Sequence, residues 1–254
     1  MGIEKSHNQW QRDTLEGRLR IDLAAMFRIA ANFNWHESVG NHFSAAVSPD
    51  GSQFLMNPRW RHFSSLTASD LVLFDGRDKS VLDGPDAPDP SAWAIHSSMH
   101  AALPRARCIL HVHPTYATAL SALADPSLKA IDQNTARFHG RISVDLGYDG
   151  IADNDVEGQR LAAALADKDI LMMGNHGVLV VGATVHEAFE DLYFLERACQ
   201  TMILAYSTGQ KLNAMPQELA ERTADDWRRY GGMARAHFDE MKGLLARREP
   251  DYAH

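Results

Sequence analysis

Apolar and polar positions follow two different periods along the first part of the chain. Arg18–Asn32 repeats apolar residues at helical spacing, which predicts an amphipathic helix. His42–Val47 and Gln53–Asn57 are short alternating runs on either side of a Ser-Pro-Asp-Gly turn at 48–51, and this pattern predicts a β-hairpin. Leu71–Phe74 is expected to add a further short strand.

A proline-rich loop separates these elements from the middle of the chain. Asp83–Pro90 holds three prolines and cannot keep regular structure, because proline lacks a backbone donor and restricts the residue before it. Ser91 is expected to cap a helix over 92–102. Cys108–His113 is short and apolar, which predicts a strand, and helical spacing resumes over Thr115–Ala124.

A second hairpin is predicted further along. Asp169–Met173 and Val178–Val181 flank a Gly-Asn-His-Gly turn at 174–177. A Thr-x-x-Glu capping box at Thr184 then opens a helix that is expected to run to Ser207. Strands and helices are mixed throughout and hairpins are present, so we expect an α/β chain with layers of the α+β kind around a mainly antiparallel sheet.

The 254 residues show no internal repeat and no linker between domains. We therefore expect one main domain over 18–212, preceded by an N-terminal extension over 1–17. The polar stretch Asp225–Arg248 is expected to be helical. It belongs to a C-terminal extension over 213–254 that packs on the same domain or on a neighbouring subunit.

Composition narrows the classes of partner and compartment. The net charge of −8 comes without any run of basic residues, which argues against nucleic acid as a partner. No segment approaches the roughly 18 apolar residues of a membrane span, and the first residues lack the apolar core of a signal peptide. Cys108 and Cys199 lie in apolar runs and are expected to be free thiols, so we expect a cytoplasmic protein.

The histidines carry the candidate chemistry. His111 and His113 are two positions apart in a predicted strand, so both imidazoles leave the same face. His176 lies in the turn at 174–177 and is the candidate third ligand. Three neutral imidazoles that leave one position open are typical of a catalytic metal site. Zinc is the metal we expect, and manganese or iron would suit the same ligands.

Four segments in this order resemble the class II aldolase/adducin family: Gly-Asn-His-Phe-Ser at 40–44, His-x-His-Pro at 111–114, Gly-Asn-His-Gly at 174–177 and Phe-Leu-Glu-Arg-Ala at 194–198. The resemblance implies a three-layer fold with a central, mainly antiparallel sheet flanked by helices.

The same resemblance implies a site for this chain. It makes His111, His113 and His176 the ligands of a divalent metal, usually zinc, in a homotetramer with sites near subunit contacts. It also assigns Gly40 and Asn41 to a substrate-binding loop, although an Asn after Gly is also an ordinary turn residue.

The chain departs from the sugar-phosphate aldolases of that family at two places. Ala92 stands where those enzymes have a catalytic Glu, and it cannot transfer a proton. Arg59, Trp60 and Arg61, together with Ser91, stand where those enzymes bind phosphate. Guanidinium groups pair with carboxylates and an indole stacks on flat rings, so an aromatic or otherwise planar carboxylate fits better than a ketose phosphate. A plain solvated face is the alternative for the two arginines.

Another residue must then handle protons. His96 lies on the helix after the proline-rich loop and is the candidate catalytic acid or base. His100 lies one turn later, so the two histidines also have the spacing of a helical metal pair.

The resulting hypothesis is a divalent-metal-dependent carbon–carbon lyase acting on a small carboxylate. Decarboxylation or cleavage of a non-phosphorylated aldol suits the residues better than cleavage of a sugar phosphate. One alternative is a non-haem iron oxygenase that uses the same three histidines. The other is a non-catalytic, adducin-like interaction protein, an interpretation favoured by the missing Glu and opposed by the three retained histidines.

Overall fold

The computed structural model describes residues 10–147, 150 and 154–254. Within these residues one sheet has the strand order β3-β2-β1-β4-β7-β6-β5. Every neighbouring pair is antiparallel except β5 and β6. The strands are β1 (His42–Ala46), β2 (Gln53–Met56), β3 (Val72–Asp75), β4 (Cys108–Val112), β5 (Ile142–Asp145), β6 (Ile170–Met173) and β7 (Gly177–Gly182).

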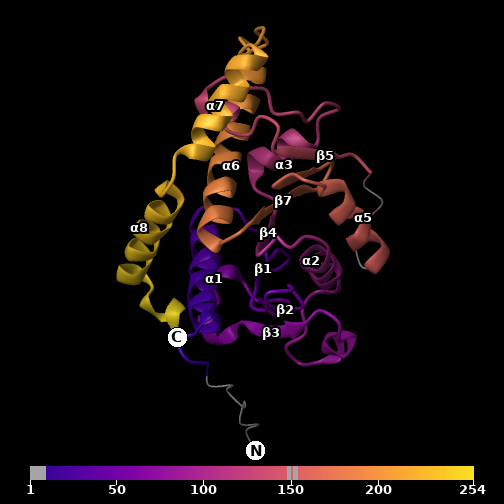
Figure 1. Ribbon diagram of the computed structural model, residues 1–254, viewed down its shortest axis with the longest axis vertical. Helices are drawn as coiled ribbons and strands as arrows, with labels where there is room; N and C mark the ends of the chain where they lie inside the picture. Colours follow the sequence, from indigo (N-terminus) through magenta and orange to yellow (C-terminus); the bar gives the residue numbers. More distant parts are fainter. Residues whose placement is uncertain (1–9, 148–149, 151–153) are drawn as a thin grey trace, which may run out of the picture.

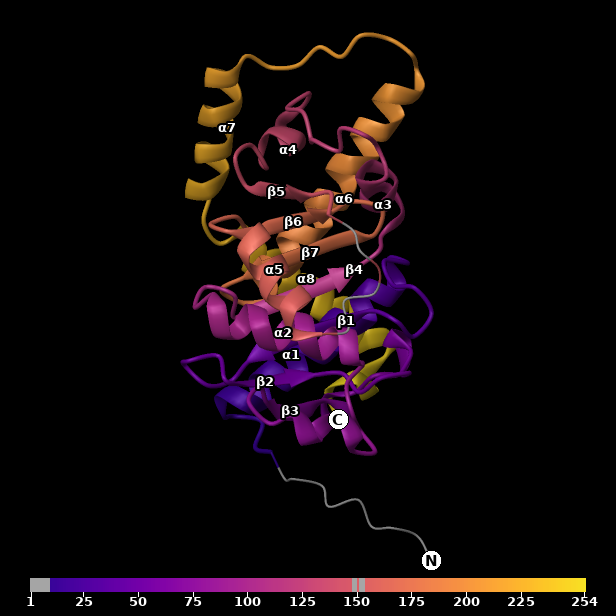
Figure 2. The same ribbon diagram turned by 90° about the vertical axis from the view of Figure 1, so that its right-hand side faces the viewer.

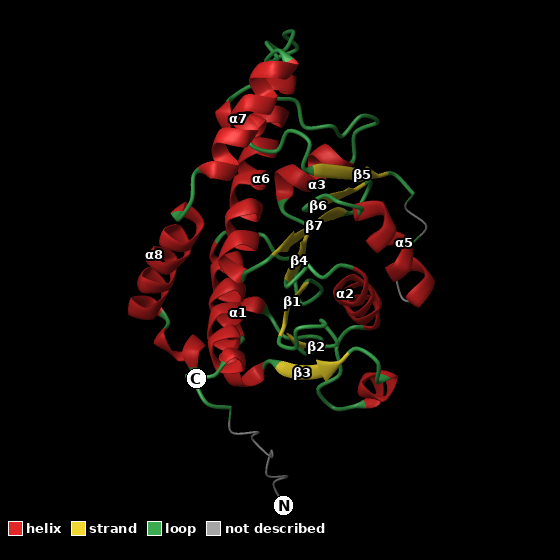
Figure 3. Ribbon diagram, in the orientation of Figure 1, coloured by secondary structure: helices red, strands yellow, loops and turns green. Residues whose placement is uncertain are grey.

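Helices cover both faces of this sheet (Figures 1 and 3). The α-helices are α1 (Leu15–Asn32), α2 (Pro90–Ala102), α3 (Thr115–Ser121), α4 (Gln133–Ala136), α5 (Asp155–Leu165), α6 (Val185–Ser207), α7 (Gln217–Arg229) and α8 (Met233–Arg248). Short 3-10 turns are η1 (Phe63–Ser65), η2 (Ala68–Asp70), η3 (Lys79–Asp83) and η4 (Pro250–Ala253). The expected central, mainly antiparallel sheet between helices is confirmed.

Alternation along β4 divides the core into two layers. Leu110 and Val112 face a large apolar cluster built with α1 and α6. Ile109 faces the opposite cluster, which is built with α2 and α5. Because side chains alternate along a strand, His111 lies on the same face as Ile109, toward α2. The sheet therefore keeps its histidines apart from the main apolar core.

The structure confirms both predicted hairpins, β1–β2 and β6–β7, and corrects several element boundaries. Helix α1 begins at Leu15, ahead of the start expected at Arg18. Asp89, rather than Ser91, caps α2: its side chain accepts from the backbone of Ser91, and Pro90 is the first helical residue. The reason is that proline suits the first helical position, where no donor is needed.

The C-terminal stretch forms two helices and not one. It breaks between α7, which ends at Arg229, and α8, whose N-cap Gly232 adopts a φ of 86°, a left-handed conformation through which a helix cannot continue. Helix α7 packs beside α4 (Figure 2), while α8 runs beside α1 and α6 (Figure 1). None of the helices in the described part of the chain has the length and apolar character needed to cross a membrane.

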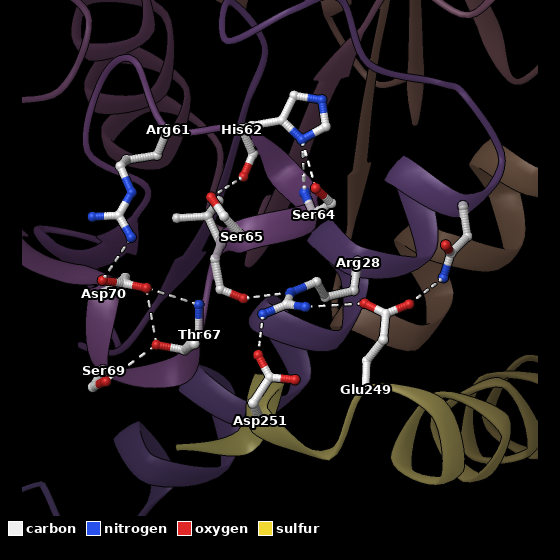
Figure 4. Close-up of polar contacts among 12 residues, drawn as sticks. Arg28, Arg61, His62, Ser64, Ser65, Thr67, Ser69, Asp70, Glu249 and Asp251 are labelled. Atoms are coloured by element: carbon white, nitrogen blue, oxygen red, sulfur yellow. Dashed lines mark hydrogen bonds and ion pairs between the residues drawn. The ribbon is translucent and has the colours of Figure 1, made fainter.

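Ion pairs hold the last described residues of the chain against α1. Arg28 is 5% exposed and forms ion pairs with Glu249 at 3.0 Å and Asp251 at 2.7 Å (Figure 4). Its Nε also donates to the carbonyl of Leu66 at 2.8 Å. A single buried guanidinium thus joins α1, η4 and the loop after η1.

Candidate metal centre

Two histidines of the candidate centre lie at the end of the central strand β4. Register pairing sets His111 opposite His42 on β1 and opposite Leu179 on β7. His111 is 2% exposed, whereas His113 extends just beyond the strand and is partly exposed. Their Nε2 atoms are 3.1 Å apart, as the two-residue period of the strand predicts.

His176 reaches the same place from the turn between β6 and β7. Its imidazole ring centroid is 4.9 Å from that of His111 and 4.6 Å from that of His113. A Cβ atom on Gly177 would come within 2.4 Å of the His113 ring, so only glycine fits there. One ligand atom from each of the three histidines lies within 4.8 Å of the others. The structure therefore brings together the three histidines that the sequence singled out.

Hydrogen bonds behind two of the rings fix their tautomers. Nδ1 of His111 donates to the carbonyl of Val178 at 3.1 Å, because a carbonyl oxygen can only accept. Nδ1 of His113 is 2.6 Å from Oε2 of Glu37, so this nitrogen carries the proton that the carboxylate accepts. In the neutral rings both Nε2 atoms are then lone-pair acceptors that face each other.

The donor set suits a divalent metal. Burial lowers the pKa of His111 well below its ordinary value, and burial followed by the charge of His113 lowers the pKa of His176 to about 4. The rings of His111 and His176 are thus neutral near pH 7, which is the form that binds metals. Two facing lone pairs repel unless a cation lies between them, and tetrahedral zinc–nitrogen bonds of about 2.0–2.1 Å place nitrogens roughly 3.3 Å apart. The observed separation of 3.1 Å is close to that value.

Glu37 is a site residue that sequence reasoning missed. It belongs to the loop before β1, where Oδ1 of Asn41 accepts from its backbone N–H at 2.6 Å and Gly40 N donates to its carbonyl at 2.9 Å. Gly40 and Asn41 therefore shape the loop that presents a carboxylate to His113. No sequence motif marks Glu37, because its partner is 76 positions away.

A chain of hydrogen bonds extends from the centre into the space between β1 and α2. The rings of His42 and His111 have centroids 4.9 Å apart. Nδ1 of His42 then contacts Nε2 of His96 at 2.8 Å, and Nδ1 of His96 contacts Ser44 Oγ at 2.5 Å. Ser44 Oγ is in turn 2.7 Å from Nε2 of His100.

The far end of this chain determines its direction. Nδ1 of His100 lies 2.7 Å from the carbonyl of Ala106, so this nitrogen carries a proton and Nε2 accepts from Ser44. Ser44 then accepts from Nδ1 of His96, and Nε2 of His96 accepts from Nδ1 of His42. Burial keeps these rings neutral by lowering the pKa of His42 and of His100 to about 3. Nε2 of His42 is therefore left as a proton acceptor beside His111.

This placement limits what His96 can do directly. His96 is fully buried, and both of its ring nitrogens are engaged in the chain. His42 lies between His96 and the three candidate ligands. Any effect of His96 on a reacting molecule therefore passes through His42. The proton-transfer role of His96 stays a prediction.

The arginine–tryptophan segment lies between two loops of the centre. Arg59 N donates to the carbonyl of Ala87 at 3.0 Å, and His62 Nε2 contacts His36 Nε2 at 2.7 Å, next to Glu37. Trp60 is 69% exposed and adopts a φ of 62°, which is costly for a side chain of this size.

The two arginines of this segment have different surroundings. The guanidinium of Arg59 stacks on the Trp60 ring at 4.5 Å. Arg61 instead pairs with Asp70 at 3.1 Å (Figure 4). Arg61 is thus already neutralised, whereas Arg59 and Trp60 present a planar, cationic surface.

Residues 21–203 match the family model described as "Class II Aldolase and Adducin N-terminal domain". This chain belongs to the class II aldolase and adducin family. A protein of Caulobacter vibrioides, provisionally named an aldolase class 2 protein, is 34% identical over 218 residues, which are 86% of this chain and 83% of that protein. The family expected from the sequence is therefore confirmed.

Solved structures of the class II aldolase and adducin family have the same fold. An aldolase II superfamily protein from Pseudomonas syringae gives a TM-score of 0.85 at 34% identity and covers 93% of this chain and 95% of its own. L-fuculose 1-phosphate aldolase from Glaciozyma antarctica gives a TM-score of 0.78 at 26% identity and covers 97% of both chains.

Ala92, which the sequence resemblance sets at the position of the catalytic Glu of sugar-phosphate aldolases, is buried near the start of α2. Its methyl group packs in an apolar cluster with Phe54 and Trp93. Ser91 lies at the start of α2, and its hydroxyl donates to Asp89 at 2.6 Å. Asp89 is half-buried and its charge acts on His42, which makes it the nearby carboxylate that the sequence did not single out.

Proposed function

We propose that this class II aldolase and adducin family member is a divalent-metal-dependent carbon–carbon lyase acting on a small carboxylate. The convergence of His111, His113 and His176, with two Nε2 lone pairs facing each other, is the observation that carries the proposal. Zinc is the metal we expect, and manganese and iron suit the same donors. We also expect the protein to be cytoplasmic and to form a homotetramer. Native mass spectrometry tests the oligomeric state.

When bound, the metal supplies Lewis acidity toward the carbonyl and neighbouring oxygen of the substrate. His111, His113 and His176 would hold it. The hydrogen bonds that His111 and His113 donate to Val178 and Glu37 keep these two rings in the metal-binding tautomer. The chain itself therefore contributes a prearranged set of neutral nitrogens.

The substrate carboxylate is assigned to Arg59, with the indole of Trp60 against a flat part of the molecule. The exposure of Trp60 and its stacking on Arg59 support this assignment. Arg61 holds the segment through Asp70, while Gly40, Asn41 and Ser91 shape the adjoining loops.

Decarboxylation is the reaction that these residues suit best. The bond between the carboxylate carbon and its neighbour breaks, carbon dioxide leaves, and the electron pair stays on the neighbouring carbon, which then takes up a proton. This sequence needs no base before the bond breaks, in keeping with Ala92 at the Glu position.

Aldol cleavage of a non-phosphorylated substrate differs because a hydroxyl proton must leave as the bond breaks. Nε2 of His42 is the acceptor for that proton, with His96 and Ser44 holding the ring in the required tautomer. His96 is then a positioning residue.

The first experiment is elemental mass spectrometry of protein purified without chelator, with His111→Ala as the control. About one divalent metal per chain, lost in the variant, is the expected result. Metal-dependent carbon dioxide release from hydroxy-carboxylates would then support decarboxylation. His42→Gln separates the two reactions, since it should abolish aldol cleavage and leave carbon dioxide release largely intact.

Two other results would redirect the proposal. Stoichiometric iron with oxygen consumption would indicate an oxygenase on the same histidines. A protein that neither contains nor takes up metal would favour a non-catalytic, adducin-like role. The absence of turnover with every hydroxy-carboxylate and aldol substrate tested would favour the same role. Ala92 and the burial of His96 are the observations on the side of that last role.

A further inference from the structure

A cavity of about 390 Å³ opens beneath the C-terminal helices, away from the histidines. Its wall includes Gly182, the last residue of β7, and the segment 230–233 between α7 and α8. Strand β7 begins at Gly177, beside His176, so the cavity and the histidines lie at opposite ends of the strand, roughly 17 Å apart. The volume falls within the roughly 300–1,000 Å³ of small-molecule sites.

Arg137 lines this cavity and carries an unsatisfied charged donor. It is 8% exposed, and its guanidinium carbon lies 4.2 Å from the centre of the Phe194 ring and 4.7 Å from that of Trp227. Its Nη2 donates to Glu190 at 3.3 Å. Its Nη1 is buried and has no hydrogen-bond partner among the residues that the structure describes. A buried donor of this kind is costly unless something accepts from it.

The buried acidic groups around the cavity already have partners. Arg141 donates to both carboxylate oxygens of Asp191, at 3.0 and 2.6 Å, and to Asp169 at 2.9 Å. Glu190 also accepts from His237 at 2.6 Å. Glu187 lines the cavity too, but its side chain is exposed to solvent.

Arg105, also in the cavity wall, has a second donor without a hydrogen-bond partner among the described residues. Nη2 of Arg105 donates to the carbonyl of Lys168 at 2.8 Å, while its buried Nε lacks a partner within the described ranges. The unpaired polar atoms that we find in this wall are therefore hydrogen-bond donors of arginine side chains. An anion with acceptor oxygens would pair with them.

We propose that the cavity binds a small organic anion whose carboxylate or phosphate oxygens accept from Nη1 of Arg137. Contacts with the rings of Phe194 and Trp227 restrict this guanidinium, so little entropy is lost when the anion binds. Trp227 and Tyr230 form an aromatic wall for the body of the ligand. This site is separate from the metal centre and does not depend on the lyase activity.

The test is calorimetric titration of the full-length, chelator-treated protein with three separate probes: benzoate, phenyl phosphate and inorganic phosphate. We expect saturable binding of one aryl anion per chain, and the benzoate and phenyl phosphate arms identify the preferred charged group. Arg137→Met should weaken binding roughly tenfold or more, because it removes the donor. Arg235→Met removes an equal charge from an exposed part of α8 outside the cavity and should leave binding unchanged.

Two more variants keep the test decisive. Ala183 lines the cavity and is exposed, so Ala183→Trp should fill the volume without disturbing the fold, and binding should be lost. His111→Ala should retain binding. The proposal is overturned if no probe binds at millimolar concentration, if Arg137→Met and Ala183→Trp bind normally, or if His111→Ala abolishes binding. It also fails if Ala183→Trp changes the oligomeric state by light scattering, because the cavity would then be a contact between copies.

Discussion

Single side chains set the ring tautomers of the candidate metal centre. Glu37 contacts His113 at 2.6 Å although its own side chain is 64% exposed. A carboxylate behind a ligand imidazole fixes the ring orientation and raises its basicity. The strength of the proposed site thus depends on a residue outside the ligand set.

We expect Glu37→Gln to weaken metal binding by about 10- to 100-fold without unfolding the protein. Competition against a fluorescent chelator measures the affinity. Glu218→Gln, at an exposed position in the first turn of α7, serves as the matched control and should bind metal as the parent does. Equal affinities in both variants would show that the contact with His113 is not used.

Trp60 offers a separate test of strain. Its φ of 62° favours glycine, and its largely exposed ring loses little burial when removed. Trp60→Gly should therefore be more stable than Trp60→Ala by about 1 kcal/mol, since both lack the ring and only alanine keeps the strain. Urea unfolding measures the difference. Identical midpoints would mean that the backbone at this position relaxes.

Sequence reasoning found the histidines but not the groups that support them. The two-residue period of a strand is a local property, so His111 and His113 could be paired from the sequence. Glu37 and the His42–His96–Ser44 contacts depend on how β1 packs against β4 and α2, which no local pattern encodes. The misplaced cap of α2 has a different origin. Asp89 and Ser91 are equally good caps by residue type, and Pro90, which suits the first helical position, is a local signal that favours Asp89.

At the level of elements, buried imidazoles join α2 to β1. His100 on α2 contacts Ser44 on β1 and the carbonyl of Ala106. Burial lowers its folded-state pKa from 6.5 to about 3. Between these two values the unfolded chain binds a proton that the folded chain does not bind, so the stabilisation is complete above pH 6.5 and falls as the pH drops toward 3.

We expect His100→Gln to flatten this dependence. Glutamine can still donate to Ala106 and accept from Ser44, but it does not titrate. The free energy of unfolding of the parent should fall more steeply below pH 6.5 than that of the variant, by about 1.4 kcal/mol per pH unit. Urea titrations at several pH values in the presence of chelator measure both. Parallel curves would contradict the prediction.

Elements with local signals were predictable and elements with distant partners were not. The turn residues at 48–51 and 174–177 predict hairpins by themselves, because they are of types that favour tight turns. Strand β5 has only four residues, and it pairs in parallel with β6 only after the α5 crossover, so its partner is not visible locally. The break in Asp225–Arg248 depends on one left-handed glycine, Gly232, within an otherwise helical composition.

For the whole molecule, Arg28 decides how the last residues are held. Arg28→Met should lower the free energy of unfolding by about 2 kcal/mol, since the Leu66 carbonyl loses its donor and two carboxylates lose a charged partner. The Glu249 and Asp251 side chains are partly solvated, which keeps the loss moderate.

Hydrogen exchange should show the loss directly, with faster exchange of the amides in η4 for Arg28→Met. Lys129→Met removes an exposed pair with Asp125 and should change stability by less than about 0.5 kcal/mol. If both variants behave alike, the C-terminal segment is held by its apolar contacts instead.

The central position of β4 has a consequence for the order of folding. Its two neighbours in the sheet, β1 and β7, come from opposite halves of the chain, and so do His111 and His176. Neither half can assemble all three histidines by itself, and such long-range pairing is slow to form. A metal ion added during refolding should therefore bind only in the last kinetic phase. The rate of metal binding would then report the rate at which the native sheet is completed.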